Sequence, residues 1–518
     1  MAQARRPLID RLRTAWRSPR WGVHPDDHKR PAADYPVRVM PVPKRLYVPL
    51  MQHIGAPAEA RVEIGQTVRT GELLAAPQGA VSAPVHAPSS GLVVDIAEVI
   101  APHPSGLTLP AVIIETDGRD RWVERESLDD PFLLSPAEIS RRVAAAGVVG
   151  LGGAAFPSSV KLVGGRSADV THLLVNGAEC EPYLSCDDRL MRDRAAAIIE
   201  GLRIVRFATG ASEAIVGIED NKPEALAAMR DAAGIDRLIE VRSIPAHYPM
   251  GSERQLVQTL TGHEIPAGGR PSDVGALVHN VGTLLAVRHA VCDGRALISR
   301  FVTVAGGAVR APGNIEVRIG TLAADLVDYC GGLTAPPARM LLGGPMMGFR
   351  VETLEVPIVK GTSGVLLLDA AELAECAPGP CIRCGNCVSA CPCGLLPLEM
   401  SRHVQAGDLD GAVALGLKDC LSCGCCAYVC PAHLPLVQSF HYARGELAAR
   451  ARAGSKLESA KRLARARAER LEREAREKAQ AAARRRAEKA AQAAAGTPAE
   501  SGESSGKRHR EPDPAEAT

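Results

Sequence analysis

Short apolar and polar runs alternate along residues 39–119, and glycine or proline separates most of them. Alternation with a period of two is typical of strands that bury one face, so these residues predict an all-β domain with frequent turns. Residues 120–290 change to apolar runs of strand length, separated by stretches with helical spacing. That order predicts a parallel α/β sheet covered by helices.

The two ends of the chain are polar. Residues 1–38 carry apolar positions at helical spacing among arginines, which predicts a basic arm that either lies on an anionic membrane or packs on the protein. Residues 446–495 are mainly Ala, Arg, Glu and Lys, with opposite charges at i and i+4, and predict an exposed charged helix. Residues 496–518 mix Gly, Ser, Pro and charges, so we expect disorder there.

Composition narrows the class of protein. A chain of 518 residues has room for several domains, and at 46% hydrophobic residues it can bury sizeable cores. The formal net charge of +2 argues against a nucleic acid as the main partner. Because no apolar run approaches the ~20 residues of a membrane span, we expect no transmembrane segment in this chain. Any attachment to a membrane would come from partner proteins or from a surface helix.

Eleven of the 15 cysteines lie within residues 376–430 and form the most specific motif of the chain. The pattern C-x2-C-x2-C-x3-C-P occurs twice, and bacterial ferredoxins use it to bind a pair of [4Fe–4S] clusters. The fourth thiolate of each run ligates the other cluster. We therefore assign one cluster to Cys381, Cys384, Cys387 and Cys430, and the other to Cys420, Cys423, Cys426 and Cys391.

Other uses of these cysteines fit the pattern less well. A zinc site needs four ligands, so the third cysteines and the Cys-Pro endings would be surplus. Disulfides need an oxidising compartment, whereas we see no secretory signal and expect a reducing cytoplasm. Cys376, Cys393 and Cys425 fall outside the motif. Cys425 could compete for iron, but a packed thiol is the simpler interpretation.

A glycine-rich loop lies early in the α/β region. It contains Gly150, Gly152 and Gly153, and Lys161 follows it. Glycines let backbone N–H groups approach a phosphate or a flavin closely, and the lysine adds positive charge. A second polar group follows an apolar strand: Asn176, Glu179 and Glu181. Such residues lie at the carboxyl edge, where open α/β sheets bind ligands.

These two motifs carry a family resemblance. Gly-x-Gly-Gly-Ala-x-Phe-Pro at residues 150–157, followed by Asn-x-x-Glu-x-Glu-Pro at residues 176–182, resembles the FMN- and NADH-binding subunit of respiratory complex I. The whole arrangement resembles the C subunit of the Rnf (Rsx) electron-transport complex more closely. Its hallmarks here are Gly-Val-His-Pro at 22–25, Gln-His-Ile-Gly-Ala-Pro at 52–57, Gly-Ile-Glu-Asp-Asn-Lys-Pro-Glu at 217–224, Lys-Gly-Thr-Ser-Gly at 360–364 and the ferredoxin-type ending. The resemblance covers roughly residues 20–445.

The resemblance implies a multidomain α/β plus β architecture. The expected parts are a basic arm (1–38), a barrel-sandwich hybrid domain (39–119), a Rossmann-like FMN/NADH-binding domain (120–290), an SLBB β-grasp module (291–370), a bacterial 2[4Fe–4S] ferredoxin-type domain (371–445), the charged helix (446–495) and the disordered tail (496–518). Biotinyl and lipoyl carriers modify a lysine in the barrel-sandwich hairpin, but residues 79–84 contain none. We therefore predict a structural barrel.

The same resemblance assigns site residues by motif. Gly150, Gly152, Gly153 and Lys161 would hold the FMN phosphate and ribityl chain; Asn176, Glu253, Asn280 and Thr283 would line the flavin; Phe156, Glu179 and Glu181 would face the nicotinamide nucleotide. A carboxylate beside the ribose favours NADH over NADPH. No side chain is expected to act as a catalytic acid or base.

The sequence departs from the family pattern at three places. Ala155 stands where the loop usually has glycine, and His279 replaces the first residue of an Asn-Asn pair. Residues 162–164 lack the second aromatic that complex I subunits place after the lysine. We therefore expect weaker stacking of the adenine than in complex I.

The resemblance implies an NADH-facing electron-transfer subunit of a membrane-bound, ion-translocating oxidoreductase complex. FMN, two [4Fe–4S] clusters and NADH as substrate would give an NADH:acceptor oxidoreductase subunit, since FMN splits an electron pair. The expected partners are the other subunits, a ferredoxin-type carrier and NAD(H), and the expected place is the cytoplasmic face of the bacterial inner membrane. Two alternatives stay open: a cobalamin reductase of the propanediol-utilisation type, and a non-catalytic iron–sulfur relay with a vestigial flavin site.

Overall fold

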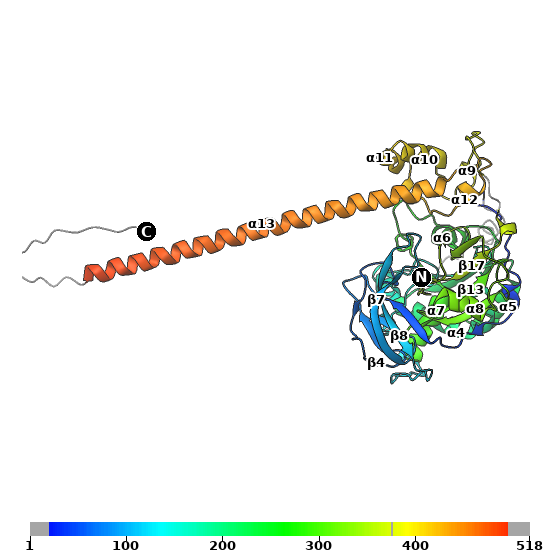
Figure 1. The fold of residues 1–518 in the computed structure, drawn as a ribbon, viewed down its shortest axis with the longest axis horizontal. Helices are drawn as coiled ribbons and strands as arrows, with labels where there is room; N and C mark the ends of the chain where they lie inside the picture. Colours follow the sequence, from blue (N-terminus) through cyan, green and yellow to red (C-terminus); the bar gives the residue numbers. More distant parts are fainter. Residues whose placement is uncertain (1–19, 374–376, 496–518) are drawn as a thin grey trace, which may run out of the picture. The chain divides into compact units, whose positions relative to one another are not determined.

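A computed structural model describes residues 20–373 and 377–495 (Figure 1). The predicted helix near residues 8–16, Cys376 and the predicted disordered tail lie outside the described residues. The chain divides into two compact units, Met1–Arg444 and Gly445–Thr518. All domains with candidate chemistry belong to the first unit.

Two small antiparallel sheets confirm the predicted all-β region. One has the order β2 (Arg45–Pro49), β8 (Thr108–Thr116), β7 (Gly91–Ile100), β4 (Thr67–Val68); the other has the order β3 (Glu59–Ala60), β5 (Leu73–Ala76), β6 (Val85–His86). Alternate residues of these strands, such as Leu46, Val48 and Ile114, are fully buried in one core. In Figure 1 the labelled strands β4, β7 and β8 are drawn in blue.

A four-stranded parallel sheet forms the α/β domain. Its order is β11 (Ile239–Ile244), β10 (Glu213–Glu219), β9 (His172–Gly177), β12 (Ala276–Asn280). The helices are α2 (Pro136–Ala145), α3 (Ser158–Ser167), α4 (Cys186–Thr209), α5 (Pro223–Ala233), α6 (Glu253–Thr261) and α7 (Val281–Cys292). In β9, Leu173 and Val175 join one apolar core and Leu174 joins another, so both faces of the sheet are covered.

A six-stranded mixed sheet follows in the chain. Its order is β1 (Arg38–Val39), β14 (Gly313–Arg318), β13 (Ser299–Ala305), β17 (Gly364–Leu368), β15 (Arg339–Leu342), β16 (Phe349–Arg350), and α8 (Ala323–Tyr329) packs with it. The edge strand β1 pairs in parallel with β14, although the two are almost 280 residues apart in the sequence. The start of the chain is therefore part of this late sheet.

Short helices lie within and between the two cysteine motifs. They are α9 (Asn386–Ser389), α10 (Pro397–Gln405), α11 (Leu409–Ala414) and α12 (Cys425–Tyr428). Single 3-10 turns occur at Ala32–Asp34, Pro131–Leu133, Pro271–Val274, Ala370–Glu372 and Leu417–Asp419. The last helix, α13 (Leu436–Ala495), begins with Leu436, Phe440 and Ala443 buried in the first unit.

The second unit consists, within its described residues, of the remainder of α13. Beyond Leu447 every described side chain is exposed, and Lys461 pairs with Glu458 three positions earlier. This is the charged helix that the composition predicts. In residues 20–373 and 377–495, no helix is both long and apolar enough to cross a membrane.

Candidate functional site

The glycine loop between α2 and α3 is held by its own backbone. Gly150 N–H donates to Phe156 O at 2.8 Å, and Ser158 N–H donates to Val148 O at 3.0 Å. Gly153 has φ +106°, and a Cβ there would meet nothing within 4 Å. Ala155 has φ +48°. An alanine in this left-handed region costs about 1 kcal/mol, a cost that the glycine expected at this position would avoid.

Two buried groups from distant parts of the chain anchor the loop. Leu151 N–H donates to the hydroxyl of Thr283 at 2.9 Å, as the position of Thr283 at the start of α7 allows. Arg300, which is 2% exposed, donates to Leu151 O at 2.8 Å and to Thr362 O at 2.9 Å. Burial lowers the pKa of Arg300. The sequence analysis missed Arg300 because the residues beside it in the sequence form no motif that predicts a role.

The start of α3 suits an anionic group. Ser158 is 1% exposed, and its hydroxyl has no hydrogen-bond partner among the described residues. The positive end of the helix dipole lies at the same place. Lys161, one turn further, donates to Glu253 Oε1 at 3.2 Å and to Val278 O at 3.1 Å. A buried unpaired hydroxyl, a helix N-terminus and a lysine together fit the phosphate of FMN.

Two asparagines end neighbouring strands and fix the loops beside them. Asn176, at the end of β9, donates to Gly251 O at 2.8 Å. Asn280, at the end of β12, accepts from Gly282 N–H at 2.9 Å and so caps α7. Its amide donates to Asp187 Oδ2 at 2.6 Å. A Cβ on Gly152 would lie 3.3 Å from Asn280 Cβ, so the glycine loop packs directly on this strand end.

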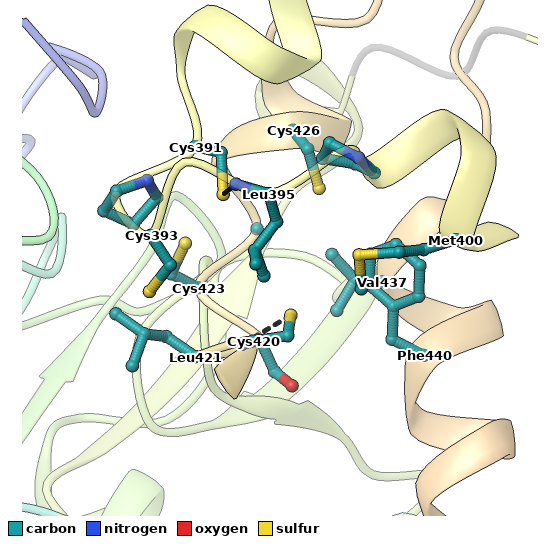
Figure 2. A pocket seen from close by; sticks show the side chains of 14 residues that line it. Cys391, Cys393, Leu395, Met400, Cys420, Leu421, Cys423, Cys426, Val437 and Phe440 are labelled. Carbon is teal, nitrogen blue, oxygen red and sulfur yellow. Dashed lines mark hydrogen bonds between the residues drawn. The ribbon is translucent and has the colours of Figure 1, made fainter. Parts of the chain in front are cut away.

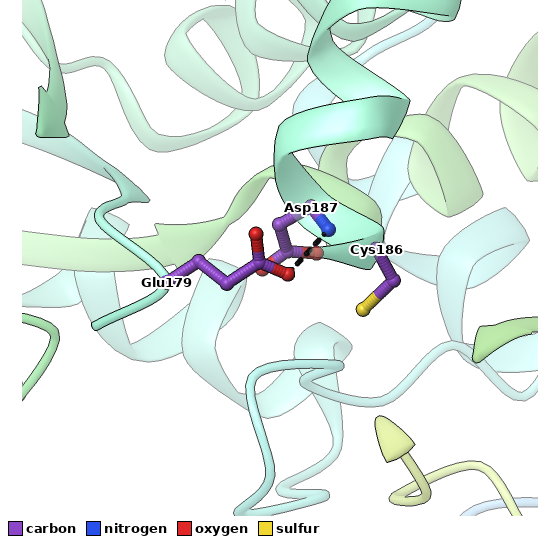
Figure 3. Close-up of side chains that lie close together, drawn as sticks. All are labelled: Glu179, Cys186 and Asp187. Atoms are coloured by element: carbon purple, nitrogen blue, oxygen red, sulfur yellow. Dashed lines mark hydrogen bonds between the residues drawn. The ribbon is translucent and has the colours of Figure 1, made fainter. Parts of the chain in front are cut away.

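Glu179, Cys186 and Asp187 gather where β9 leads into α4 (Figure 3). Glu179 accepts from Asp187 N–H at 2.7 Å and from Asp188 N–H at 3.0 Å, so its carboxylate caps α4. Burial, and then the charge of Glu179, raise the pKa of Asp187 to about 7. The three side chains are close enough to hold a metal ion, but capping already accounts for the carboxylate of Glu179.

Glu181 is turned toward the six-stranded sheet. Its two carboxylate oxygens accept from Met346 N–H at 3.0 Å and Met347 N–H at 2.8 Å. Burial raises its pKa to about 7. A Cβ on Gly344 would approach Glu181 Oε2 to 2.2 Å, so this turn requires glycine. The carboxylate predicted to face the nucleotide therefore also fixes a neighbouring domain.

A lysine from the start of the chain fastens the Glu179–Glu181 segment. The ammonium of Lys29 donates to Glu179 O at 2.9 Å, to Glu181 O at 3.0 Å and to Leu184 O at 2.5 Å. Burial lowers the pKa of Lys29. The sequence offers no signal for this role, because the partners are backbone carbonyls about 150 residues away.

The structure thus brings most of the predicted cofactor residues into one connected region. The connected residues are Gly150, Gly152, Gly153, Phe156, Lys161, Asn176, Glu179, Glu253, Asn280 and Thr283. His279 is buried beneath them, its Nε2 lacks a partner among the described residues, and burial lowers its pKa to about 3. A neutral imidazole therefore replaces the amide expected there.

Four predicted cluster ligands line one pocket (Figure 2): Cys391, Cys420, Cys423 and Cys426. Cys391 comes from the first motif and the other three from the second, as the exchange of fourth thiolates requires. Cys393 also lines the pocket, together with apolar residues such as Leu421 and Phe440. Thiolates around an apolar pocket fit a cubane cluster shielded from water.

The two cysteine loops share one backbone conformation. Arg383 and Ser422 have φ +57° and +56°, and each donates its N–H to the sulfur of the first cysteine of its loop at 3.4 Å. Gly385 and Gly424 have φ +80° and +84°. The loops differ in exposure: Cys384 is exposed and Cys423 is buried. Hydrogen bonds to sulfur are one way in which a protein tunes a cluster.

The second cysteine loop and the end of the first cysteine motif pack against other parts of the chain, the α/β domain among them. Tyr248 is 2% exposed and donates its hydroxyl to Cys423 O at 2.7 Å. Gln255 of α6 donates to Pro392 O at 2.9 Å. Gly22 and Val23, near the start of the chain, bond to Ala390 O and to the backbone of Tyr248. Residues from three parts of the sequence therefore close this junction.

Comparison with known families gives four matches in chain order. They are the RnfC barrel sandwich hybrid domain at residues 18–119, the Nuo51 FMN-binding domain at 143–289, the SLBB domain at 301–350 and the 4Fe-4S dicluster domain at 380–434. The matches confirm the predicted fold class and the cofactor types of the domains. The fold and the site define an electron-transfer protein with flavin-binding and iron–sulfur domains.

Relatives that match most of the chain show which family of electron-transfer proteins it belongs to. The chain is 49% identical over 432 residues to the C subunit of the ion-translocating oxidoreductase complex of Rhodobacter capsulatus, covering 83% of each chain. It is 44% identical to the C subunit of the proton-translocating ferredoxin:NAD(+) oxidoreductase complex of Clostridium ljungdahlii, over 74% of this chain and 83% of the relative. The chain belongs to the family of Rnf C subunits, as its motifs predict.

Two further comparisons show a more limited similarity, to a longer relative and to a solved structure. The C subunit of the Pseudomonas aeruginosa complex is 47% identical over 81% of this chain, which spans only 54% of that relative. Among solved structures, an NAD+-reducing [NiFe]-hydrogenase chain aligns with 62% of this chain and 67% of its own length, at 21% identity and a TM-score of 0.43. That score is too low to establish a common overall fold.

Proposed function

We propose that this chain exchanges electrons between NADH and a ferredoxin-type acceptor within an Rnf-type, ion-translocating complex. The observation that carries the proposal is the junction at Tyr248: its hydroxyl bonds to Cys423 O, and so joins the candidate flavin domain to a candidate cluster loop. A redox module needs such contact, because electron transfer between separate cofactors requires short, packed paths.

Each group of residues has one task in this proposal. The glycine loop with Gly150, Gly152 and Gly153 binds the FMN phosphate and ribityl chain together with Ser158 and Lys161; Asn176, Glu253, Asn280 and Thr283 line the flavin; Phe156, Glu179 and Glu181 bind the nicotinamide nucleotide. When bound, FMN accepts an electron pair from NADH and releases single electrons, which iron–sulfur clusters carry. The side chains position these groups and exclude water.

The two cysteine sets have different tasks. The set of Cys391, Cys420, Cys423 and Cys426 packs against the α/β domain and is the flavin-side set. The set of Cys381, Cys384, Cys387 and Cys430 includes an exposed cysteine and lies beside Ile382, which is 67% exposed. An exposed thiolate next to an exposed apolar side chain suits docking of a redox partner, so this is the partner-side set.

Membership of the family also supports a proposal about where the protein lies. We propose that the chain is held at the cytoplasmic face of the bacterial inner membrane by the other subunits of its complex. A relative from Clostridium ljungdahlii carries the name of a proton-translocating ferredoxin:NAD(+) oxidoreductase complex, which supports ferredoxin as the partner class and ion transport as the output of the whole complex.

An anaerobic NADH titration tests this function. The protein is reconstituted with iron, sulfide and FMN; flavin absorbance near 450 nm is followed, and then the EPR of reduced clusters. We expect NADH to bleach the flavin and reduced-cluster signals to follow. If clusters are present but NADH leaves the flavin oxidised, the NADH assignment is wrong and the chain is a relay supplied with electrons from elsewhere.

One variant tests cluster reduction separately from the reduction of the flavin by NADH. Tyr248→Phe keeps the ring packed in the junction but loses the hydrogen bond to Cys423 O. We expect flavin bleaching at the wild-type rate and slower appearance of the cluster signal. Phe132→Leu, at a half-exposed aromatic away from this junction, serves as the control. Equal cluster reduction in wild type and Tyr248→Phe would show that this hydrogen bond has no part in the path.

A further inference from the structure

A second pocket lies away from the candidate cofactor residues, around the tryptophan of the segment that follows β8. Its volume is about 540 Å³, and its lining residues are Trp122, Val123, Arg125, Ser127, Asp293 and Arg295. Pockets that bind small molecules typically have volumes of roughly 300–1,000 Å³. The function proposed above uses none of these residues.

Three arginines surround the ring of Trp122. The guanidinium carbons of Arg125, Arg295 and Arg318 lie 4.5, 5.3 and 6.0 Å from the centre of the ring. The aromatic face attracts each cation, but the three positive charges repel one another. Burial lowers the pKa of Arg295, and the charges of Arg318 and Arg125 lower it further. A negatively charged ligand would offset this repulsion.

Two of these three guanidinium groups have no acidic partner. Arg318 pairs with Asp120 at 2.6 Å. For Arg125 and for the half-buried Arg295, the described part of the chain supplies neither a hydrogen bond nor an ion pair to the guanidinium group. A guanidinium group has five N–H donors and no acceptor. Two such groups without acceptors at one pocket favour an anion as the ligand.

The acids near Arg295 bind other groups. Asp293, which also lines the pocket, accepts from Arg288 at 2.5 Å and bonds to His289 at 2.8 Å. Glu316 accepts from a serine hydroxyl at 3.0 Å. Both carboxylates raise the pKa of Arg295 through their charge, but neither forms an ion pair with it in the described structure. The guanidinium donors of Arg295 therefore stay available to a ligand.

The two chain segments that carry Arg125 and Arg295 pack against each other. Leu128 N–H donates to Cys292 O at 2.8 Å. A Cβ on Gly294, which has φ +60°, would lie 2.8 Å from a backbone carbonyl oxygen of the other segment. These contacts fix both walls of the pocket, so a ligand would enter a site that is already formed, and little ordering would oppose its binding.

We propose that this pocket binds a phosphate group, held by the guanidinium groups of Arg125 and Arg295 beside the ring of Trp122. The planar fork of an arginine donates two parallel N–H bonds to phosphate oxygens. A phosphate has enough oxygens and charge to accept from both arginines that line the pocket, whereas a carboxylate carries a single charge. The phosphate belongs to a soluble compound or to a lipid head group, which present the same chemistry. This site is separate from the proposed electron transfer.

Calorimetry with inorganic phosphate tests the site on the full-length protein, loaded with FMN and reconstituted with its clusters. FMN fills the candidate phosphate site at α3, and sodium chloride keeps the ionic strength constant. We expect one saturable site. Binding should weaken at least about tenfold in Arg295→Gln, because a half-buried bond to a charged group is lost, and roughly threefold in Arg125→Gln, because that arginine is exposed.

Arg141→Gln is the matched control. It removes the same charge from a side chain that is 75% exposed on α2 and does not line the pocket, so it should bind phosphate as wild type does. Flavin and iron content show that each variant has folded, and the exposed Arg125 keeps the test valid if Arg295→Gln does not fold. The inference is overturned if wild type shows no saturable binding, or if Arg125→Gln and Arg295→Gln bind phosphate as tightly as Arg141→Gln does.

Vesicles distinguish the two sources of the phosphate. Neutral lipid vesicles with and without phosphatidylglycerol are sedimented with the protein. Binding that needs phosphatidylglycerol, and that weakens both in Arg125→Gln and on addition of inorganic phosphate, assigns the site to a lipid head group. If phosphate binds in the pocket but wild type and Arg125→Gln sediment equally with these vesicles, the natural ligand is a soluble phosphate compound.

Discussion

The hydroxyl of Ser158 is the clearest sign of an anion site at the scale of single residues. It is buried at the start of α3 without a hydrogen-bond partner among the described residues. An unsatisfied buried polar group costs about 1–3 kcal/mol, and a phosphate oxygen at the helix N-terminus would remove that cost. A serine at this position therefore favours the loaded state over the empty one.

Because of this cost, replacing Ser158 should affect FMN binding and the stability of the apoprotein differently. Ser158→Ala should weaken FMN binding about tenfold, since a hydrogen bond to a charged group is worth about 1.5–3 kcal/mol. The same change should leave the apoprotein equally or more stable, because it removes the unpaired hydroxyl. Quenching of FMN fluorescence and urea unfolding measure the two effects.

Ser167→Ala is the control for this change, since Ser167 is exposed in the last turn of the same helix. It should alter neither quantity. Unchanged FMN affinity in Ser158→Ala would place the phosphate elsewhere.

At this scale the sequence identified residue types but not their partners. The motif led to Glu179 and Glu181, yet the structure shows their carboxylate oxygens bonded to backbone N–H groups of α4 and of Met346 and Met347. Arg300 and Lys29 were missed altogether. Both bind carbonyl oxygens more than 60 residues away, and every residue has a carbonyl, so no pattern of side chains could announce the contact.

At the scale of elements, the paired cysteine loops show how one short motif is used twice. Positive φ angles recur at Arg383 and Ser422 and again at Gly385 and Gly424. The two loops therefore share one backbone path around their cysteines. The fourth cysteine then comes from the opposite motif, as Cys391 does in the pocket with Cys420, Cys423 and Cys426.

The shared pocket predicts the iron content of two neighbouring variants. Cys391→Ala should lose the flavin-side cluster, lowering iron from about eight to about four atoms per chain, because a cubane needs four thiolates. Cys393→Ala should keep about eight, although Cys393 lines the same pocket. Iron and sulfide analysis after anaerobic reconstitution measures the difference. Loss of a cluster in Cys393→Ala instead would exchange the roles of the two cysteines.

The periodicity of the sequence predicted the types of secondary structure in each region, but it did not predict which strands pair with each other. The all-β region, the parallel sheet and the charged helix follow from local patterns, and the family matches agree with the first two. The pairing of β1 with β14 does not follow, because two residues are too few to carry a pattern. Strand order depends on packing between distant segments, which a single sequence does not display.

At the scale of the whole molecule, Lys360 joins three domains. Its ammonium donates to Pro84 O of the barrel-sandwich domain at 2.8 Å and to Gly147 O of the α/β domain at 2.7 Å, while its own backbone lies between β16 and β17 of the six-stranded sheet. Burial lowers its pKa from 10.5 to about 7. A neutral amine still has two N–H groups, which match the two carbonyls.

This lysine makes stability depend on pH. Between pH 7 and 10.5 the unfolded chain holds the proton and the folded chain does not, so the free energy of unfolding rises with pH, by at most about 1.4 kcal/mol per pH unit. Lys360→Met should lack this rise. Urea unfolding at pH 7, 8 and 9 measures it, with the exposed Lys44→Met as control. Parallel pH slopes in wild type and Lys360→Met would contradict the buried titration.

The contacts of Gly22 and Val23 also set an order in time. A ribosome adds about 5–20 residues per second, so Ala390 leaves it roughly tens of seconds after Gly22, to which it bonds. Val23 can pair with Tyr248 earlier, but Gly22 cannot form its bond until the first cysteine motif has been made. The segment made early is therefore among the last to complete its contacts.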